Sequence, residues 1–137
     1  MLTALLSFLG VLIGALLQYY FTRHIENQRH VRELRSKAYM DYLKCVCEHA
    51  QLQTQEHNKE RQDLFVRTAD SKSRICLYGS SAVIQAFSTF EKLGATMGTK
   101  EQKEAFTRMI SIMRKDSGGE MGVQSADLQT VLLGPRI

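Results

Sequence analysis

The hydrophobic positions are concentrated in an opening segment, Leu2 to Phe21, which carries no charge and no proline. At a rise of about 1.5 Å per residue, an α-helix of this length spans the roughly 30 Å hydrocarbon core of a bilayer. A buried helix of a soluble domain usually carries a polar face, whereas this segment contains only Thr3, Ser7 and Gln18. We therefore expect residues 1–22 to form a transmembrane helix.

The flanks of this segment predict its orientation. A cleaved signal peptide has a basic region before its apolar run and a small-residue cleavage site after it, and neither is present here. Aromatic residues close the segment, as they do at a membrane interface, and basic residues outnumber acidic ones directly after it. The positive-inside rule then predicts a single-pass protein of the inner (cytoplasmic) membrane, with its N-terminus outside and the rest in the cytoplasm. The basic residues are Arg23, Arg29, Arg32, Arg35 and Lys37.

One side of the predicted span is small and polar. Thr3, Ser7, Gly10, Gly14 and Gln18 recur at steps of three and four and so share one helical stripe. A GxxxG spacing lets two helix backbones approach closely in lipid, although small residues are also common in membrane helices that do not associate. The alignment of GxxxG with the polar stripe favours a homo-oligomer, such as a tetramer, that associates through Ser7, Gly10, Gly14 and Gln18. Only several copies together are able to enclose a pore.

The remaining hydrophobic pattern is helical. No glycine or proline interrupts residues 15–78, so the membrane helix is expected to continue as a cytosolic stalk to about Gln53. The polar stretch 53–61 is expected to contain the loop to a second helix, Lys59 to Leu77. The inward positions of the stalk are Val31, Leu34, Ala38, Tyr42, Cys45, Val46 and His49 or Leu52, and those of the second helix are Leu64, Phe65, Thr68, Ile75 and Leu77 or Tyr78.

Capping residues delimit two further helices. Gly79 is able to adopt a left-handed conformation that ends the second helix, and a serine after it caps a third, apolar helix, Ser81 to Leu93. Thr99 and Gln102 form a capping box for a fourth helix that runs to about Asp116. The fourth helix directs Ala105, Phe106, Met109, Ile110 and Met113 inward.

The predicted fold is all-α, with one N-terminal transmembrane helix that continues into a cytosolic antiparallel bundle of about four helices. The predicted domains are 1–22 (transmembrane helix), 23–117 (helical bundle, with 23–53 as stalk and first helix) and 118–137 (tail). The tail is either a short helix from Ser125 to Leu133, capped by Ser125, or disordered.

Composition restricts the function. The net charge of +4 comes partly from the juxtamembrane cluster, which anionic lipid attracts, so it does not indicate duplex nucleic acid. The three cysteines, Cys45, Cys47 and Cys76, are expected to be reduced, and their spacing does not predict a metal site. The sequence contains no nucleotide-binding glycine loop, nucleophile elbow or zinc-protease motif. We therefore expect no enzyme, no metal and no cofactor.

One cluster suggests an anion site. Lys72, Arg74, Tyr78, Gly79, Ser80 and Ser81 surround the junction between the second and third helices. The free N–H groups at a helix N-terminus bind phosphate, and two cations lie within about two turns of it. The cluster is either a phosphate-binding site or a helix cap with two solvated cations.

At these residues the chain resembles a known group of proteins. The basic helix with Arg35-x-Lys37-Ala38-Tyr39-x-Asp41-Tyr42-Leu43, followed by Arg74-Ile75-x-Leu77-Tyr78-Gly79-Ser80-x-x-Val83 and Phe90, is similar to small bacterial membrane-anchored helical-bundle proteins. In size and organisation the chain also resembles the membrane effectors of type III CRISPR systems. That resemblance implies an oligomeric cytosolic domain that binds cyclic tetra-adenylate and disrupts the membrane in antiviral defence.

The sequence thus leads to two hypotheses. In the first, the protein is an oligomeric, ligand-responsive membrane effector that binds an anionic second messenger, a cyclic oligoadenylate, at the Lys72–Ser81 junction and makes the bilayer leak. In the alternative, it is a membrane-tethered adaptor or phage-exclusion protein that acts through protein contacts alone.

Overall fold

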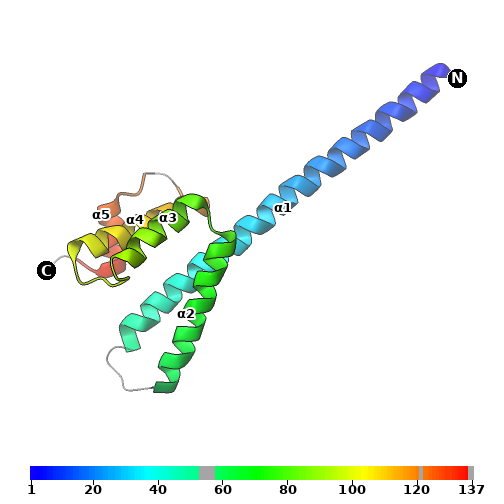
Figure 1. The fold of residues 1–137 in the computed structure, drawn as a ribbon. Helices are drawn as coiled ribbons and strands as arrows, with labels where there is room; N and C mark the ends of the chain where they lie inside the picture. The colour runs from blue at the N-terminus through cyan, green and yellow to red at the C-terminus, as the bar shows by residue number, and fades with distance from the viewer. Residues whose placement is uncertain (53–57, 121, 136–137) are drawn as a thin grey trace. The chain divides into compact units, whose positions relative to one another are not determined.

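The computed structural model describes residues 1–52, 58–120 and 122–135. Within these ranges the chain is all-helical, as predicted, and contains no strand (Figure 1). The helices are α1 (Leu2–Leu52), α2 (Asn58–Tyr78), α3 (Ser81–Lys92), α4 (Lys100–Asp116) and α5 (Ser125–Leu133). The chain divides into two compact units, Met1–Glu33 and Leu34–Ile137, and each is described by itself.

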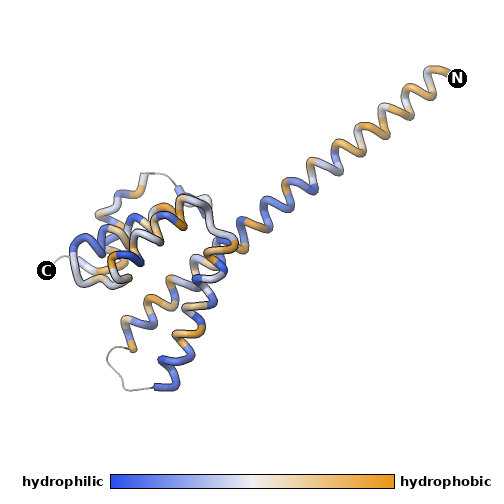
Figure 2. The backbone as a smooth tube through the Cα atoms, viewed as in Figure 1, coloured by the Kyte–Doolittle hydropathy of each residue, from blue (hydrophilic) through white to orange (hydrophobic). Residues whose placement is uncertain are grey.

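The first unit is the N-terminal part of α1. Helix α1 runs without a break from Leu2 to Leu52, as the absence of glycine and proline after Gly14 predicts. Its apolar residues gather towards the N-terminus, where the tube is mostly orange (Figure 2). Every residue of Met1–Glu33 is exposed. No part of the most apolar 18-residue window is buried, although its mean hydropathy is 1.9.

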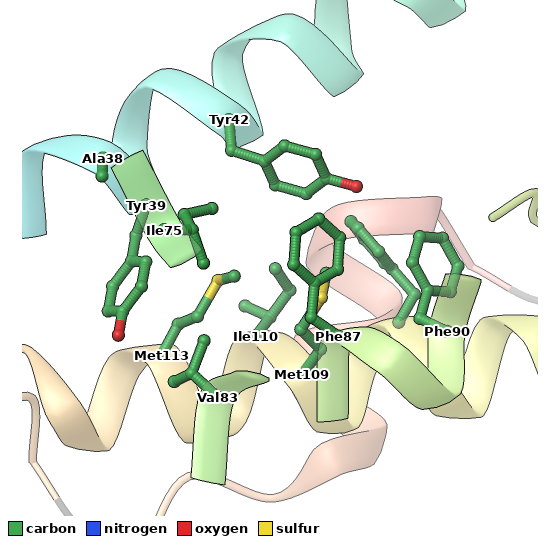
Figure 3. Close-up of a cluster of buried hydrophobic side chains, with 11 residues drawn as sticks. Ala38, Tyr39, Tyr42, Ile75, Val83, Phe87, Phe90, Met109, Ile110 and Met113 are labelled. Atoms are coloured by element: carbon green, nitrogen blue, oxygen red, sulfur yellow. The ribbon is translucent and has the colours of Figure 1, made fainter. Parts of the chain in front are cut away.

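The second unit holds the hydrophobic core. Aromatic side chains organise it: the Tyr42 ring packs edge-on against Phe87 (Figure 3), with the ring centres 4.9 Å apart. The ring of Phe90 packs against that of Phe106 at 5.3 Å. The core draws on α1, α2, α3 and α4, and Leu133 of α5 packs against it. The predicted inward positions of α4 are largely confirmed, since Phe106, Met109, Ile110 and Met113 are buried. The cluster consists of Ala38, Tyr39, Tyr42, Ile75, Val83, Phe87, Phe90, Phe106, Met109, Ile110 and Met113.

Within this unit, α1 and α2 are joined by a ladder of ion pairs. Arg67 contacts Glu48 at 2.6 Å, and one heptad further along α2, Arg74 contacts Asp41 at 2.7 Å. Because the later arginine pairs with the earlier acid, the two helices run antiparallel. Each arginine also pairs with the aspartate four residues before it, at 2.8 Å in both cases. The Asp-x-x-x-Arg motif thus occurs twice on α2. The arginine of each copy forms one rung of the ladder, an ion pair with an acidic residue of α1.

The ends of α4 and α5 test two of the predicted helix caps. The predicted capping box is present, since Thr99 accepts from the Gln102 backbone and the Gln102 side chain accepts from the Thr99 backbone. The tail forms the short helix predicted as one of its two options. The prediction that Ser125 caps this helix is wrong, because the cap residue is Gln124, which makes no side-chain capping bond.

The outward face of α2 differs from the prediction. Phe65 was an expected inward position, but it is 69% exposed. Of the alternatives Leu77 and Tyr78, Leu77 is 75% exposed and Tyr78 is half-buried. The predicted inward positions Leu64 and Ile75 are confirmed, and Ser71 joins them on the core side of α2. Adjacent residues of a helix lie about 100° apart, so burial of Leu64 turns Phe65 away from the core. Of the polar stretch 53–61, which was expected to contain the loop, residues 53–57 lie outside the described ranges, and residues 58–61 belong to α2.

Candidate functional site

The candidate anion site lies where α2 ends and α3 begins. The Gly79 N–H donates to the Ile75 carbonyl at 2.7 Å, and a Cβ added at Gly79 would lie 2.5 Å from that oxygen. Glycine is therefore required at position 79, because any side chain would collide with the backbone of Ile75. The prediction of a left-handed conformation at Gly79 is wrong, since its φ is not positive. The Ser80 hydroxyl accepts from the Val83 N–H at 3.4 Å, which confirms the predicted serine cap.

The two cations of the site are both engaged by carboxylates. Lys72 contacts Glu91 of α3 at 2.5 Å, and its ammonium lies 5.7 Å from the centre of the Phe87 ring. Arg74 bridges Asp41 of α1 and Asp70 of its own helix, and these bonds raise its pKa. An external anion therefore has to displace carboxylates before it reaches either cation.

A polar network that the sequence did not predict fixes the backbone of the same junction. The Arg35 Nε donates to the Tyr78 carbonyl at 2.7 Å, and its Nη1 contacts Asp116 at 3.1 Å. The Tyr39 hydroxyl donates to the other Asp116 oxygen at 2.5 Å and accepts from the Ser80 N–H at 3.3 Å. This Arg35–Tyr39–Asp116 network thus connects α1, α4 and the α2–α3 turn. Arg35 and Asp116 are only 25% and 15% exposed.

The structure therefore brings together only part of the predicted set. Tyr78, Gly79 and Ser80 form one compact turn, whereas Lys72 is paired towards α3 and Arg74 towards α1. Ser81 is exposed. The predicted association residues Ser7, Gly10, Gly14 and Gln18 lie in the first unit, where a Cβ at either glycine would meet open space. Ser7 donates to the Thr3 carbonyl at 2.9 Å.

Other signs of chemistry in the described ranges would be metal-binding groups, reactive thiols or unpaired buried polar atoms. No group of three or more His, Cys, Asp and Glu residues that could hold a metal ion occurs there. The cysteines are all free thiols, with Cys45 buried and Cys47 and Cys76 exposed. Every buried polar side-chain atom that the structure describes has a hydrogen-bond partner.

Two buried tyrosines give the second unit a sensitivity to alkaline pH. Burial and the hydrogen bond to Asp116 raise the pKa of Tyr39, and burial and the charge of Glu91 raise the pKa of Tyr42. The folded chain thus holds both protons more tightly than the unfolded chain, in which each pKa has its ordinary value of 10. The resulting stabilisation is complete below pH 10 and is lost as the pH rises further.

We therefore expect the free energy of unfolding to fall steeply above pH 10. Denaturant unfolding of the full-length chain in detergent, followed by circular dichroism at pH 8 to 12 in ~0.5-unit steps, measures this slope. Tyr42→Phe is the matched variant, because it removes one of the two titrating groups, and its slope should be shallower. Identical slopes for the variant and the native chain would contradict the assignment.

The chain matches no protein-family model, no curated protein and no solved structure.

Proposed function

We propose that the protein is a single-pass membrane protein whose helical second unit is an adaptor that acts in the cytoplasm through protein contacts. The proposal that α1 spans a membrane is supported by the exposure of its apolar segment. Its large side chains from Leu2 to Phe21 are 49% to 78% exposed. Burial of one such side chain contributes about 1.5–3 kcal/mol, so a bilayer is the environment that stabilises a helix apolar on nearly every side.

The basic residues after the apolar segment support the orientation. Arg23, Arg29 and Arg32 follow it and are exposed, in the position where cationic residues meet the cytoplasmic surface of a membrane. Tyr19 and Tyr20 stand at the expected interface, and Arg23 donates to the Tyr19 hydroxyl at 3.0 Å. This arrangement supports an outside N-terminus and a cytoplasmic second unit at the inner membrane.

The pairing of charges at the candidate site supports an adaptor over a ligand receptor. Lys72 and Arg74 are neutralised by Glu91, Asp41 and Asp70, and the Tyr78 carbonyl and Ser80 N–H have partners in the Arg35–Tyr39–Asp116 network. A site prepared for a phosphate usually presents unpaired donors. These contacts instead join the helices of the second unit into one body.

The second candidate is the ligand-responsive membrane effector, and the position of Arg74 favours it. Arg74 links α2 to α1 through Asp41, so an anion that displaced Asp41 would break one rung of the ladder between the two helices. Such an anion, for which cyclic tetra-adenylate is the test ligand, would thereby change α1. Copies associated through Ser7, Gly10, Gly14 and Gln18 would then make the bilayer leak.

Dye-loaded liposomes that carry the purified full-length chain separate the two candidates. The adaptor proposal predicts that the vesicles stay sealed and that calorimetry detects no heat when cyclic tetra-adenylate is added. Leakage on addition would overturn the adaptor proposal in favour of the effector. In that case Arg74→Ala should abolish the response, whereas Arg67→Ala, which removes the equivalent rung one heptad away, should preserve it.

A further inference from the structure

The outward face of α2 is uncharged along most of the helix and carries exposed apolar residues at and beside its centre. Its centre is formed by residues spaced alternately four and three apart, the spacing of a helix–helix seam. Phe65 and Leu77 flank this seam, and they are 69% and 75% exposed, while Val66 within it is 60% exposed. We call this surface the α2 seam. Its central residues are Gln62, Val66, Ala69, Ser73 and Cys76, all of them exposed.

Acidic residues border one edge of the α2 seam, and basic residues border the other. At about 100° per residue, Asp63 and Asp70 fall on one edge, and Arg61 and Lys72 fall on the other at nearly equal angles from the centre. The aspartate side chains are 68% and 62% exposed, so they remain accessible although each pairs with an arginine of its own helix. Lys72 is 37% exposed beside Glu91, and Arg61 is exposed.

We propose that the α2 seam binds the α2 seam of a second copy of this chain, with the two helices parallel and in register. A two-fold axis along such a pair places the acidic edge of each copy against the basic edge of the other. Arg61 then lies level with the second copy's Asp63, and Lys72 with its Asp70. An antiparallel pair would instead place acid against acid and base against base, which costs stability.

The composition of the α2 seam fits close approach. Ala69, Ser73 and Cys76 are small, so two backbones are able to come near each other at the centre, and the larger Phe65, Val66 and Leu77 then gain apolar burial. This inference rests on α2 alone, and it holds whether or not α1 spans a membrane. A shared membrane would orient two copies alike, in agreement with the parallel arrangement.

Disulfide trapping tests both the contact and its direction. Cys76 lies in the α2 seam, so a parallel, in-register pair places the two Cys76 thiols side by side. We expect mild oxidation of the full-length chain in detergent micelles to give a dimer in the Cys47→Ser variant, which keeps Cys76. The Cys76→Ser variant keeps the exposed Cys47 on α1 and should give little dimer. Equal trapping of the two variants, or no trapping of Cys76, would overturn the proposal.

Two exposed valines, one in the α2 seam and one on another helix, provide a matched control for the proposed contact surface. Val66→Lys, made in the Cys47→Ser background, puts a charge at the seam centre in both copies and should lower the trapping rate by a factor of about ten or more. Val131→Lys changes a valine on α5 that is even more exposed, at 83%, and should leave the rate unchanged. Retained trapping with Val66→Lys would show that the copies meet elsewhere, and it would overturn the proposal. Association through α1 alone would give that result.

Discussion

Replacement of Phe90 by alanine is expected to lower the free energy of unfolding of the second unit by about 3–5 kcal/mol. Phe90 is 1% exposed, and its ring packs against Phe106 in the middle of the core. Truncation removes a buried ring and leaves a cavity that rigid neighbours on α3 and α4 fill only partly. Denaturant unfolding of the full-length chain in detergent, followed by circular dichroism, measures the change.

Phe65→Ala is the matched control for this prediction. Phe65 is 69% exposed, so on monomeric protein the same truncation should change the unfolding free energy by no more than about 0.5 kcal/mol. Similar losses for both variants would contradict the assignment of Phe90 to the core and of Phe65 to the surface.

Removal of the Asp116 carboxylate should lower the unfolding free energy by about 3 kcal/mol, the second largest effect that we expect. Asp116 is 15% exposed and receives two hydrogen bonds, one from the Arg35 guanidinium and one from the Tyr39 hydroxyl. Asp116→Ala leaves a partly buried guanidinium without its counter-charge and a hydroxyl proton without its acceptor. Hydrogen bonds to charged groups contribute about 1.5–3 kcal/mol each, but they are not additive.

Glu104 of α4 supplies the control for Asp116. Its carboxylate contacts Lys100 at 3.8 Å and is 57% exposed, so Glu104→Ala should cost less than about 0.5 kcal/mol. A double-mutant cycle between Arg35→Ala and Asp116→Ala should give a coupling energy of about 1–3 kcal/mol. A coupling energy near zero would mean that the two side chains do not interact in solution.

Helix boundaries were predictable from the sequence because they depend on neighbouring residues. The capping box of Thr99 and Gln102 acts within one turn, and Gly79 and Ser80 end one helix and begin the next within two residues. The stripe of apolar side chains on α4 likewise predicted its buried face. Each of these signals is complete within a few positions of the chain.

Contacts between distant residues were not predictable in this way. Arg35 and Asp116 are 81 positions apart, and no local pattern pairs them. Helix α2 carries apolar residues on both sides, so the pattern alone did not decide between Leu64 and Phe65 as the inward position. The repeated Asp-x-x-x-Arg motif contained a usable signal, since two arginines one heptad apart indicate a second helix that supplies acids at the same spacing.

The candidate anion site illustrates the same limit. Lys72, Arg74 and the capped turn were recognisable as residues suited to phosphate. Whether they are unpaired depends on Asp41 of α1 and Glu91 of α3, which tertiary packing brings to them. Their ion pairs are what shift the functional proposal from ligand binding towards protein contacts.

The placement of α1 in a bilayer is the central claim, and alkaline carbonate extraction of cell membranes tests it most directly. The full-length chain should stay in the membrane pellet after extraction. A Leu9→Arg/Leu12→Arg variant should shift to the supernatant, because each arginine near the centre of a span costs about 2.5–3.5 kcal/mol of insertion free energy. Recovery of the native chain in the soluble fraction, without detergent, would contradict the claim.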